Sequence, residues 1–551
     1  MAFGILEDRH MELVPGTACM NDQSDVPREY EQVPRSHLKH GTGRLSHVIL
    51  VPQPSDSPND PLNWPLWQKD LILLIVGFSA SVVGAFGPML SPGFVEVSKE
   101  LNISVNTLAQ ATSWLLLTLG LCLFIMNPIA KVYGRRPVFI VAIAIMFTSS
   151  VWAACAKNYQ SFLASRIVSG FGMAPYEVLV QCTVGDLYFV HQRATRIAVW
   201  NLFLLCGITG GSLVGGYIIE DLGWKWTFWI CAIFFGIFIF LVVFFVPETA
   251  YNRVVPAERV VDTHLSATDE EKQEASVDHE EMPSPTSSQA PVPPTSTLDP
   301  KTPYVQTLRF TTGNHYSSAP FWKILLRPFV ILFYPAVAWA FLIYGVTLTW
   351  IVVFSVVNAS IFTAPPYSFT VSQVGLISLS PFILTIVGQV ISGPLNDWLC
   401  LYFAKRNRGV YEPEFRLVLM VPVFVLGVVG FFGFGATVEN KTHWMGPVLT
   451  FGLANMSMAF AGGCTFGYVI DSYEDLSEEA FVAINARNLL TFGLTYFVND
   501  WLEKDGPLKV FNVLGGTFVA VTALTIPLWV FGKRLRGLIA RNEFLTGFMK
   551  N

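Results

Sequence analysis

The sequence predicts an all-α membrane protein with about twelve transmembrane helices, arranged as two six-helix bundles. Hydrophobic residues make up 52% of the 551 residues and charged residues only 14%, whereas a water-soluble chain carries about 25% charged residues. Apolar runs long enough to cross a membrane recur along the chain, because a spanning helix needs about 20 mostly apolar residues. A long polar insert divides these runs into two sets of six.

The spans define the expected domains. The first six are predicted at about 71–95, 108–130, 137–156, 160–187, 196–219 and 226–247. The second six are predicted at about 328–357, 372–395, 416–436, 445–469, 480–500 and 507–531. We therefore expect a polar N-terminal tail (1–69), a first bundle (70–247), a linker (248–327), a second bundle (328–531) and a C-terminal tail (532–551).

The insert 248–327 is predicted to be a disordered linker. Its middle is acidic, from Asp269 to Glu281, and a stretch rich in proline, serine and threonine follows at 283–295. Such a composition buries too little apolar surface to offset the entropy of ordering the chain. We expect the linker to be dispensable for folding.

The distribution of lysine and arginine predicts that both termini and the linker face the cytoplasm, because positively charged loops stay on that side. With this orientation, the inner loops and the C-terminal tail hold most of the basic residues. One inner segment, 471–479, is instead acidic, but acidic residues contribute little to this rule. We expect the protein to reside in the plasma membrane.

Three glycosylation sequons fall in segments predicted to lie outside the cell. They begin at Asn102, Asn358 and Asn440, and we expect these asparagines to be glycosylated. A fourth sequon, at Asn455, lies within a span and should be inaccessible.

The loop after the second span contains a basic cluster. It reads Asn127-Pro128-Ile129-Ala130-Lys131-Val132-Tyr133-Gly134-Arg135-Arg136-Pro137, and the corresponding place in the second half reads Gly393-Pro394-Leu395-Asn396-Asp397-Trp398. The basic residues either anchor the loop on the inner side or form part of a gate between the halves.

The fourth span carries two charges on one helical face. Arg166 and Glu177 are 11 residues apart, which is about three turns and roughly 16 Å along an α-helix, so they cannot touch. Charges inside a membrane are costly and are commonly functional. For Glu177 a substrate or proton site and a purely structural hydrogen-bonded acid both remain open. We expect Glu177 to have no local partner, in which case desolvation favours its protonated form.

Glycines recur along the fifth span, which reads Gly207-Ile208-Thr209-Gly210-Gly211-Ser212-Leu213-Val214-Gly215-Gly216. Glycines four residues apart allow a neighbouring helix to approach closely. The run is also similar to the antiporter motif of proton-coupled exporters, Gly-x-x-x-Gly-Pro-x-x-Gly-Gly, with Ser212 in place of its proline.

The two loop motifs resemble the signature of the major facilitator superfamily, Gly-x-Leu-Ala-Asp-Arg-x-Gly-Arg-Arg, and its weaker second copy. The first copy keeps Ala130, Gly134, Arg135 and Arg136 but has Asn127 and Lys131 for the first glycine and the aspartate. The second copy keeps Gly393, Leu395 and Asp397. The resemblance implies gating roles for Lys131, Gly134, Arg135, Arg136 and Asp397, and Arg166 looks like the intramembrane arginine of the family's fourth helix.

Other segments resemble fungal members of the drug:proton antiporter branch, in the group with histidinol and polyamine permeases and metabolite exporters. They are 59–65 before the first span, 224–229 and 247–251 around the sixth, 409–416 before the ninth, and 471–473 with Asn485, Arg487 and Asn488 near the eleventh. The resemblance covers roughly 56–540. It implies a major facilitator fold of two six-helix bundles.

The implied function is secondary transport by alternating access, coupled to the proton gradient, of a small organic molecule across the lipid bilayer. Export of a fungal metabolite or drug is the first expectation, and uptake of a polyamine-like or other organic cation is the alternative. The candidate substrate- or proton-binding residues are Glu177, Arg166, Gln181, Asn455, Asn485 and Arg487. We expect the protein to function as a monomer.

Other function classes are disfavoured. The chain has no Gly-x-x-x-x-Gly-Lys-Ser/Thr loop for nucleotide-driven pumping. No histidine lies mid-span, so we expect no metal site, no cofactor and no enzymatic activity. The net charge of -5 implies no nucleic-acid partner. A non-transporting sensor with the same fold remains possible from sequence alone.

Overall fold

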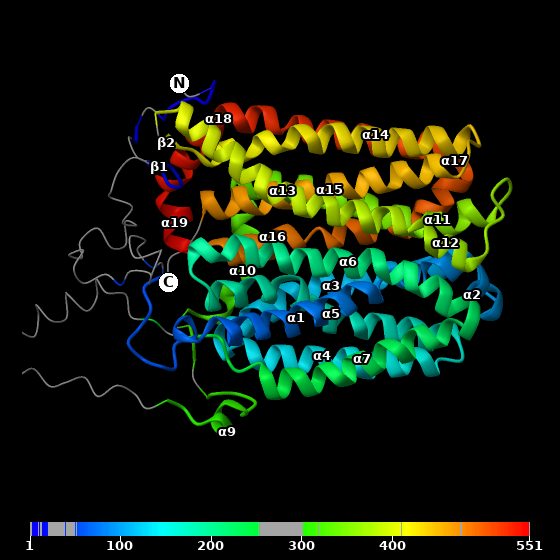
Figure 1. The fold of residues 1–551 in the computed structure, drawn as a ribbon, viewed down its shortest axis with the longest axis horizontal. Coiled ribbons are helices and arrows are strands. Elements are labelled where there is room, and N and C mark those ends of the chain that lie inside the picture. The colour runs from blue at the N-terminus through cyan, green and yellow to red at the C-terminus, as the bar shows by residue number, and fades with distance from the viewer. Residues whose placement is uncertain are drawn as a thin grey trace, which may run out of the picture.

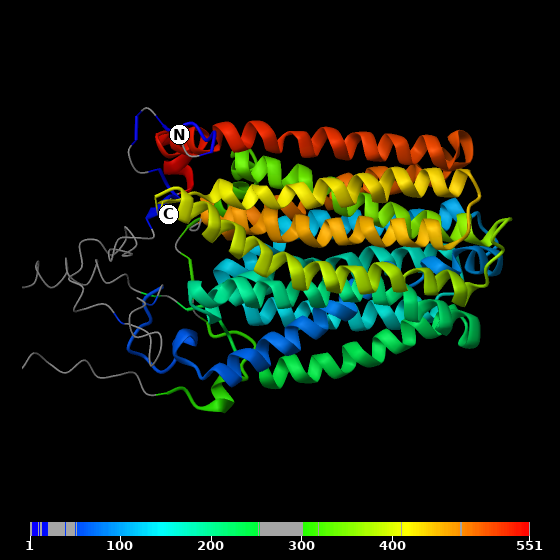
Figure 2. The same ribbon diagram turned by 45° about the horizontal axis from the view of Figure 1, so that its top comes forward.

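We describe the protein from a computed structural model. The described residues are 3–8, 10–11, 14–19, 39, 50, 52–251, 253, 301–313, 315–317, 319–408, 410–473 and 476–549. The helices lie roughly along one long axis (Figures 1 and 2), and both chain termini lie at the same end of the bundle. We call this the terminal end and the opposite one the distal end.

The first half contains six long helices, each overlapping one predicted span. They are α1 (Leu66–Phe86), α3 (Val105–Tyr133), α4 (Arg135–Cys155), α5 (Tyr159–Leu187), α6 (Val190–Leu222) and α7 (Trp224–Phe245), with a short α2 (Phe94–Glu100) after α1. Gly134 and Gly223 adopt φ angles of 103° and 88° at the α3–α4 and α6–α7 turns. Glycine tolerates this conformation because it lacks a Cβ atom.

The second half is built from α11 (Pro335–Thr363), α13 (Leu379–Arg406), α14 (Met420–Glu439), α15 (Met445–Ser472), α16 (Ser477–Asn485), α17 (Asn488–Ala523) and α18 (Thr525–Ala540). The shorter elements are α9 (Tyr304–Thr307), α10 (Phe321–Ile331), α12 (Val371–Ile377), α19 (Glu543–Met549), the strands β1 (Ala18–Cys19) and β2 (Val410–Tyr411), and the 3-10 helices η4 (Pro61–Asn63), η5 (Ser91–Gly93) and η6 (Pro413–Leu419).

Eleven segments of the described chain are long and apolar enough to cross a membrane. The last of them, Ser477–Ala540, has 64 residues and would be about 96 Å long as one straight helix, against a hydrocarbon core of about 30 Å. The chain instead turns back at Gly506, whose φ is 78°. This segment therefore crosses twice, which confirms the all-α fold with about twelve membrane helices.

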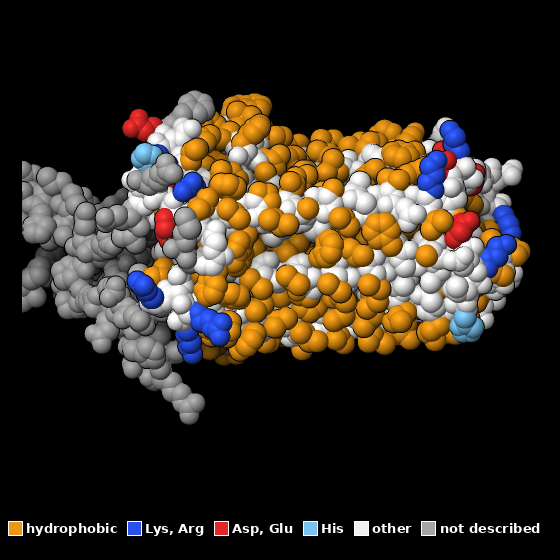
Figure 3. Space-filling model, turned by 90° about the horizontal axis from the view of Figure 1, so that it is seen from above, with side chains coloured by type: hydrophobic (Ala, Val, Ile, Leu, Met, Phe, Trp, Pro, Cys, Tyr) orange, Lys and Arg blue, Asp and Glu red, His pale blue; other side chains and the backbone are white. Residues whose placement is uncertain are grey.

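The surface matches an environment of lipid. On the face shown in Figure 3, hydrophobic side chains form a broad band along the bundle, and charged side chains gather at its two ends. Large apolar side chains are exposed on the membrane helices, among them Phe240 of α7 (57% exposed) and Val390 of α13 (61% exposed). An apolar belt of this kind belongs in the hydrocarbon region, so the protein is an integral multi-pass membrane protein.

The glycine run of α6 packs as expected. A Cβ atom on Gly207 would lie 2.0 Å from the Ser81 carbonyl oxygen, and one on Gly211 would lie 2.7 Å from the Ala85 Cα atom. One on Gly216 would lie 2.8 Å from the Gly375 Cα atom. The glycines thus bring α6 against α1 and also against α12 of the second half.

The N-terminal segment is not a detached tail where the structure describes it. Ile5 is 1% exposed and packs with Phe415, and the Leu6 N–H donates to the Val530 carbonyl oxygen at 3.0 Å. Strand β1 pairs antiparallel with β2. The apolar residues at the start of the chain therefore bury themselves on the terminal end of the second half.

The expected linker is structured at both ends. Glu248 binds the start of α4, and α10 buries Ile324 and Arg327, so the expectation that 248–327 is disordered throughout is wrong for these residues. Helix α10 is amphipathic, which is why it packs rather than remaining unfolded. The acidic and proline-rich middle of the insert, from 254 to 300, lies outside the described residues.

Two span boundaries also differ. The span predicted from 328 to 357 begins inside α10, and its membrane helix α11 runs from Pro335 to Thr363. Asn358 therefore lies within α11 and is 6% exposed, so its expected place in an outer loop is wrong. The apolar run continues past Asn358, and an asparagine alone does not end a helix that its neighbours stabilise.

Candidate functional site

A cluster of charged and polar side chains lies between the two halves, and its acidic member is Glu177 of α5. The Asn488 side-chain amide donates to Glu177 Oε2 at 2.8 Å, and Arg487 Nη2 lies 3.7 Å from the same oxygen. The expectation that Glu177 has no local partner is therefore wrong. Its partners lie more than 300 residues further along the chain, so helix periodicity within α5 cannot reveal them.

Arg487 connects several of the predicted residues. Its Nη1 donates to Asn488 Oδ1 at 2.9 Å and its Nη2 to Asn485 Oδ1 at 3.5 Å, and its guanidinium lies 5.2 Å from the centre of the Tyr344 ring. The membrane helix is interrupted here, because α16 ends at Asn485 and α17 begins at Asn488. The N-terminus of α17 thus lies beside the Glu177 carboxylate, where the helix dipole favours a negative charge.

Three other predicted residues lie outside this hydrogen-bonded group. The Asn455 amide donates to the Phe451 carbonyl oxygen within α15 at 2.9 Å. Gln181 follows Glu177 by one turn and is 2% exposed, but neither of its amide atoms has a partner among the described residues.

Arg166 is the third, and it binds elsewhere. Its Nη1 and Nη2 donate to the carbonyl oxygens of Phe86 and Gly87 at 2.9 and 3.3 Å, so it caps the C-terminus of α1. Its guanidinium lies 5.0 to 5.6 Å from the ring centres of Phe86, Phe162 and Phe228. The side chain is 0% exposed and is enclosed at the distal end of α5, away from Glu177.

Ion pairs join the halves at the terminal end. Lys131 Nζ lies 2.6 Å from Glu479 Oε1, and Arg135 Nη2 lies 2.7 Å from Glu478 Oε1. Arg327 of α10 lies 3.5 Å from the same Glu479 oxygen. These contacts would have to break for the terminal end to open, so Lys131 and Arg135 are placed where a gate requires them.

The other residues of the first loop motif act within the first half. Glu248 accepts hydrogen bonds from the backbone N–H groups of Arg135 and Arg136 at 2.8 and 3.1 Å. A Cβ atom on Gly134 would lie 2.2 Å from this carboxylate. Arg136 itself donates to backbone carbonyl oxygens, including that of Val243 at 2.7 Å, and so holds the end of α7 rather than the second half.

The remaining predicted gate residue, Asp397, is exposed on α13 and forms no ion pair with any described residue. The acids that pair with Lys131 and Arg135 are instead Glu479 and Glu478, which motif comparison did not identify. The sequence did carry a signal for them, since 471–479 was a short acidic inner segment that departed from the basic pattern of the other inner loops. Asp186 completes the gate cluster, 3.1 Å from Arg135 Nε.

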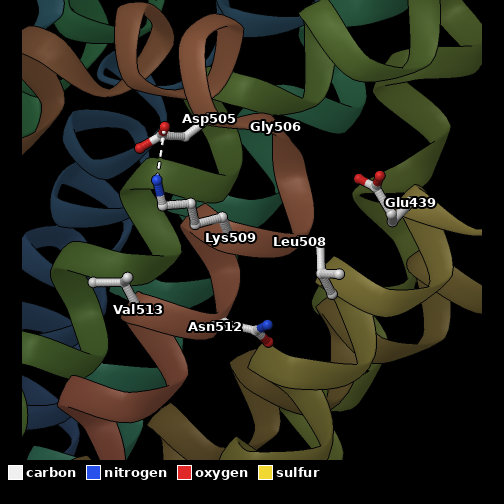
Figure 4. Close-up of a pocket in the computed structure, with 7 residues that line it drawn as sticks. All are labelled: Glu439, Asp505, Gly506, Leu508, Lys509, Asn512 and Val513. Atoms are coloured by element: carbon white, nitrogen blue, oxygen red, sulfur yellow. Dashed lines mark hydrogen bonds and ion pairs between the residues drawn. The ribbon is translucent and has the colours of Figure 1, made fainter.

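The described residues contain no group of histidine, cysteine or acidic side chains that could hold a metal ion. A cavity of about 440 Å³ lies at the distal turn of α17 and is lined by Glu439, Asp505, Gly506, Leu508, Lys509, Asn512 and Val513. Figure 4 shows that Lys509 there is paired with Asp505, at 2.9 Å. None of the predicted site residues lines this cavity.

Comparison with known proteins agrees with this architecture. The profile of the Major Facilitator Superfamily matches residues 71–498. An uncharacterized MFS-type transporter of Schizosaccharomyces pombe is 26% identical, over 98% of this chain and 95% of the relative. The efflux pump radE of Floropilus chiversii is 25% identical, over 87% of this chain and 83% of the pump.

Among solved structures, that of the proton:xylose symporter XylE of E. coli is similar, with a TM-score of 0.57. It is 14% identical and covers 86% of this chain and 100% of the symporter, a likeness that concerns the fold alone. The profile match over most of the chain, and the two halves that meet around a charged centre, show that this chain is a membrane transporter, not an enzyme, and belongs to the major facilitator superfamily, in the branch that includes fungal efflux pumps.

Proposed function

We propose that this transporter exports a small organic molecule in exchange for protons, and that Glu177 is the group that binds the proton. The observation that carries the proposal is the position of Glu177, at the contact between the two halves and shared by Asn488 and Arg487. A carboxylate at this place can change the contact between the halves by gaining or losing a proton.

The charge balance suggests how the coupling works. While Glu177 is ionised, it attracts Arg487 and accepts a hydrogen bond from Asn488, which favours contact of α5 with α16 and α17. Protonation removes the negative charge, and Arg487 keeps only its neutral partners Asn485, Asn488 and Tyr344. The bound proton thereby weakens one contact between the halves. A ligand can shift the equilibrium between two conformations only when it binds them with different affinity, and the loss of this contact provides that difference.

Export as the direction is supported by the similarity to an efflux pump. Uptake of an organic cation is the second candidate, because the ammonium group of a substrate could replace the Arg487 guanidinium at Glu177. The two are separated by direction: an exporter lowers the intracellular level of its substrate when overexpressed, whereas an uptake permease raises it. A growth and accumulation screen on deletion and overexpression strains would also identify the substrate.

The decisive variant for proton coupling is Glu177→Gln. Glutamine retains a carbonyl oxygen for the Asn488 amide but carries no charge to titrate or to attract Arg487. We expect the variant to reach the membrane in normal amounts and to lose uphill transport driven by a pH gradient, measured in vesicles at matched abundance. Transport in Glu177→Gln that remains coupled to the gradient would refute the proposed role.

We further propose that the terminal end faces the cytoplasm, that the protein works as a monomer in the plasma membrane, and that Asn102 and Asn440 are glycosylated. The basic residues of the terminal end support this orientation, and one chain supplies both halves of the central group. Asn102 and Asn440 lie in the α2–α3 and α14–α15 connections at the distal end. Protease added to intact cells should leave the linker uncut.

A further inference from the structure

Two buried amides face the contact between the halves without partners. Asn127 of α3 and Gln181 of α5 are each 2% exposed. Neither the oxygen nor the nitrogen of either amide makes a hydrogen bond with a described residue. A buried polar group left unpaired costs free energy, so an amide with both of its polar atoms unpaired calls for another partner such as water. Their surroundings indicate what that partner is.

The packing of α3 on α5 places these amides between the central group and the gate. Cys122 Sγ lies 3.8 Å from the Phe171 carbonyl oxygen, and both helices run from the distal to the terminal end. Asn127 follows Cys122 by about as many residues as Glu177 follows Phe171, so these two residues lie at a similar height along the bundle. By the same count, Gln181 lies at a similar height to Lys131. The two amides thus lie one after the other along the bundle, Asn127 level with the central acid and Gln181 nearer the gate.

Both amides also face the same neighbour. A Cβ atom on Gly120 would lie 3.2 Å from Asn488 Cβ, and Asn127 follows Gly120 by two turns on the same face of α3. Gln181 follows Glu177, which bonds Asn488, by one turn on α5. Helix α16 packs against both α3 and α5. The amides are therefore directed to the interface that α16 closes.

Unpaired polar atoms continue into the gate. Glu479 Oε2 and Arg135 Nη1 are buried and make no hydrogen bond with a described residue, although each side chain has an ion partner through another atom. The charged and titratable groups along this interface include Glu177, Arg487 and Tyr344 at the centre, and Lys131, Arg135, Cys182, Asp186, Arg193, Arg327, Glu478 and Glu479 at the gate.

We propose that Asn127 and Gln181 line a narrow water-filled path through which protons pass between the terminal end and Glu177. Water can both donate to and accept from an amide, and so matches all four unpaired atoms. Such a path would let Glu177 exchange its proton while the ion pairs of the gate stay closed to a larger substrate. Asn127 stands where the family signature has glycine, so this chain places a hydrogen-bonding group where the signature residue has none.

The inference rests on the proposed proton binding by Glu177, and protons alone can test it. The purified full-length protein is subjected to a rapid pH jump with a pH-indicator dye, and the phase of proton uptake absent in Glu177→Gln is assigned to Glu177. We expect Asn127→Leu and Gln181→Leu to slow this phase at least about tenfold with unchanged amplitude, because an apolar wall removes the hydrogen bonds that hold the water.

Two further variants separate the path from general damage. Asn127→Ser retains a hydroxyl group that can hydrogen-bond water and should keep a rate close to that of the wild type. Asn499→Leu removes another buried amide with an unpaired oxygen, more than two turns from Asn488 toward the distal end, and should also leave the rate unchanged. Unaltered rates in Asn127→Leu and Gln181→Leu, or equal slowing in Asn499→Leu, would overturn the path.

Failure of the proposed function has a different signature. If the wild type shows no proton uptake that depends on Glu177, both the proton coupling and the path are refuted. If that phase is present and insensitive to the two leucine substitutions, the path alone is refuted and proton binding by Glu177 stands.

Discussion

Arg166 and Glu177 lie on one face of α5 but meet opposite surroundings. Arg166 is enclosed with no acidic partner among the described residues, and its charge is stabilised by the carbonyl oxygens at the end of α1 and by three phenylalanine rings. A helix C-terminus carries a partial negative charge, and ring faces attract cations. Glu177 instead shares its charge with the second half. At the scale of single residues, the first charge holds helices of one half together, and the second joins the two halves.

We therefore expect substitutions of Arg166 to act on stability first. Arg166→Ala leaves two buried carbonyl oxygens without donors and opens a cavity among the rings, which should cost roughly 2–5 kcal/mol. Arg166→Lys should recover part of this, because it keeps the charge but cannot reach both carbonyl oxygens with one planar group. In measurements of thermal unfolding and surface abundance, we expect stability to decrease in the order wild type, Arg166→Lys, Arg166→Ala. Normal stability in Arg166→Ala, with transport lost, would instead assign Arg166 to the transport site.

At the scale of elements, the ion pairs that we propose as the gate join helices that the chain brings together from distant positions. Helices α3 and α4 supply Lys131 and Arg135, α16 supplies Glu478 and Glu479, and α10 adds Arg327. Glu479 is 1% exposed, so its negative charge is stabilised by its ion partners and not by water. Removing one member of a buried ion pair is more costly than breaking a surface pair, because the remaining charge stays desolvated.

Substitution of the gate acid should open the terminal end. Glu479→Gln leaves Lys131 and Arg327 without their shared anion, and we expect the ratio of closed to open molecules to fall by about tenfold, or roughly 1.4 kcal/mol. Spin labels at Tyr133 and Tyr402, both exposed, would report the separation of α3 from α13. Glu543→Gln on α19 is the control and should leave the distances unchanged. Identical distance distributions in Glu479→Gln and the wild type would exclude this ion pair as a latch.

At the scale of the whole molecule, the linker joins the halves but is held at both ends. Arg136 donates to the carbonyl oxygens of Leu308 and Arg309 at 3.1 and 3.0 Å, and the Tyr304 hydroxyl donates to the Phe244 carbonyl oxygen at 2.6 Å. Residues 301–313 therefore pack on the first half, although they follow the acidic and proline-rich middle of the insert. The acidic stretch before them can vary without changing these contacts.

This division predicts how far the linker can be replaced. A glycine–serine linker of similar length in place of 262–300 should leave the thermal midpoint unchanged, since that composition offers no core. Extending the replacement through 313 removes the Tyr304 hydroxyl and no longer positions the two carbonyl oxygens that accept from Arg136 at 308 and 309, and it should lower the midpoint by about 2–4 °C. Fluorescence-detected size-exclusion chromatography after heating measures both. Equal loss in the shorter replacement would show that 262–300 packs against the bundle.

Some features of the site were accessible from the sequence and others were not. The basic loop after the second span and the acidic segment 471–479 were both visible, yet nothing local indicated that they meet. Asn485 and Arg487 were predicted site residues and do join Glu177. Arg166 was grouped with them because it shares a helical face with Glu177, but a distance of three turns, roughly 16 Å, places it nearer the distal end of α5. Asp397 follows the family motif but remains outside the gate.

The sequence by itself determined the class of the protein, the number and approximate limits of its membrane helices, and the close approach of the glycine-rich α6. These features depend on local composition, because the transfer of some 20 apolar residues into lipid and the absence of a Cβ atom need no distant partner. Only the tertiary structure decided which groups neutralise Glu177, Arg166 and Lys131, and where the first residues of the chain dock. Those partners lie tens to hundreds of residues away, and a buried charge is stabilised by whatever the packing of the helices places within about 4 Å of it.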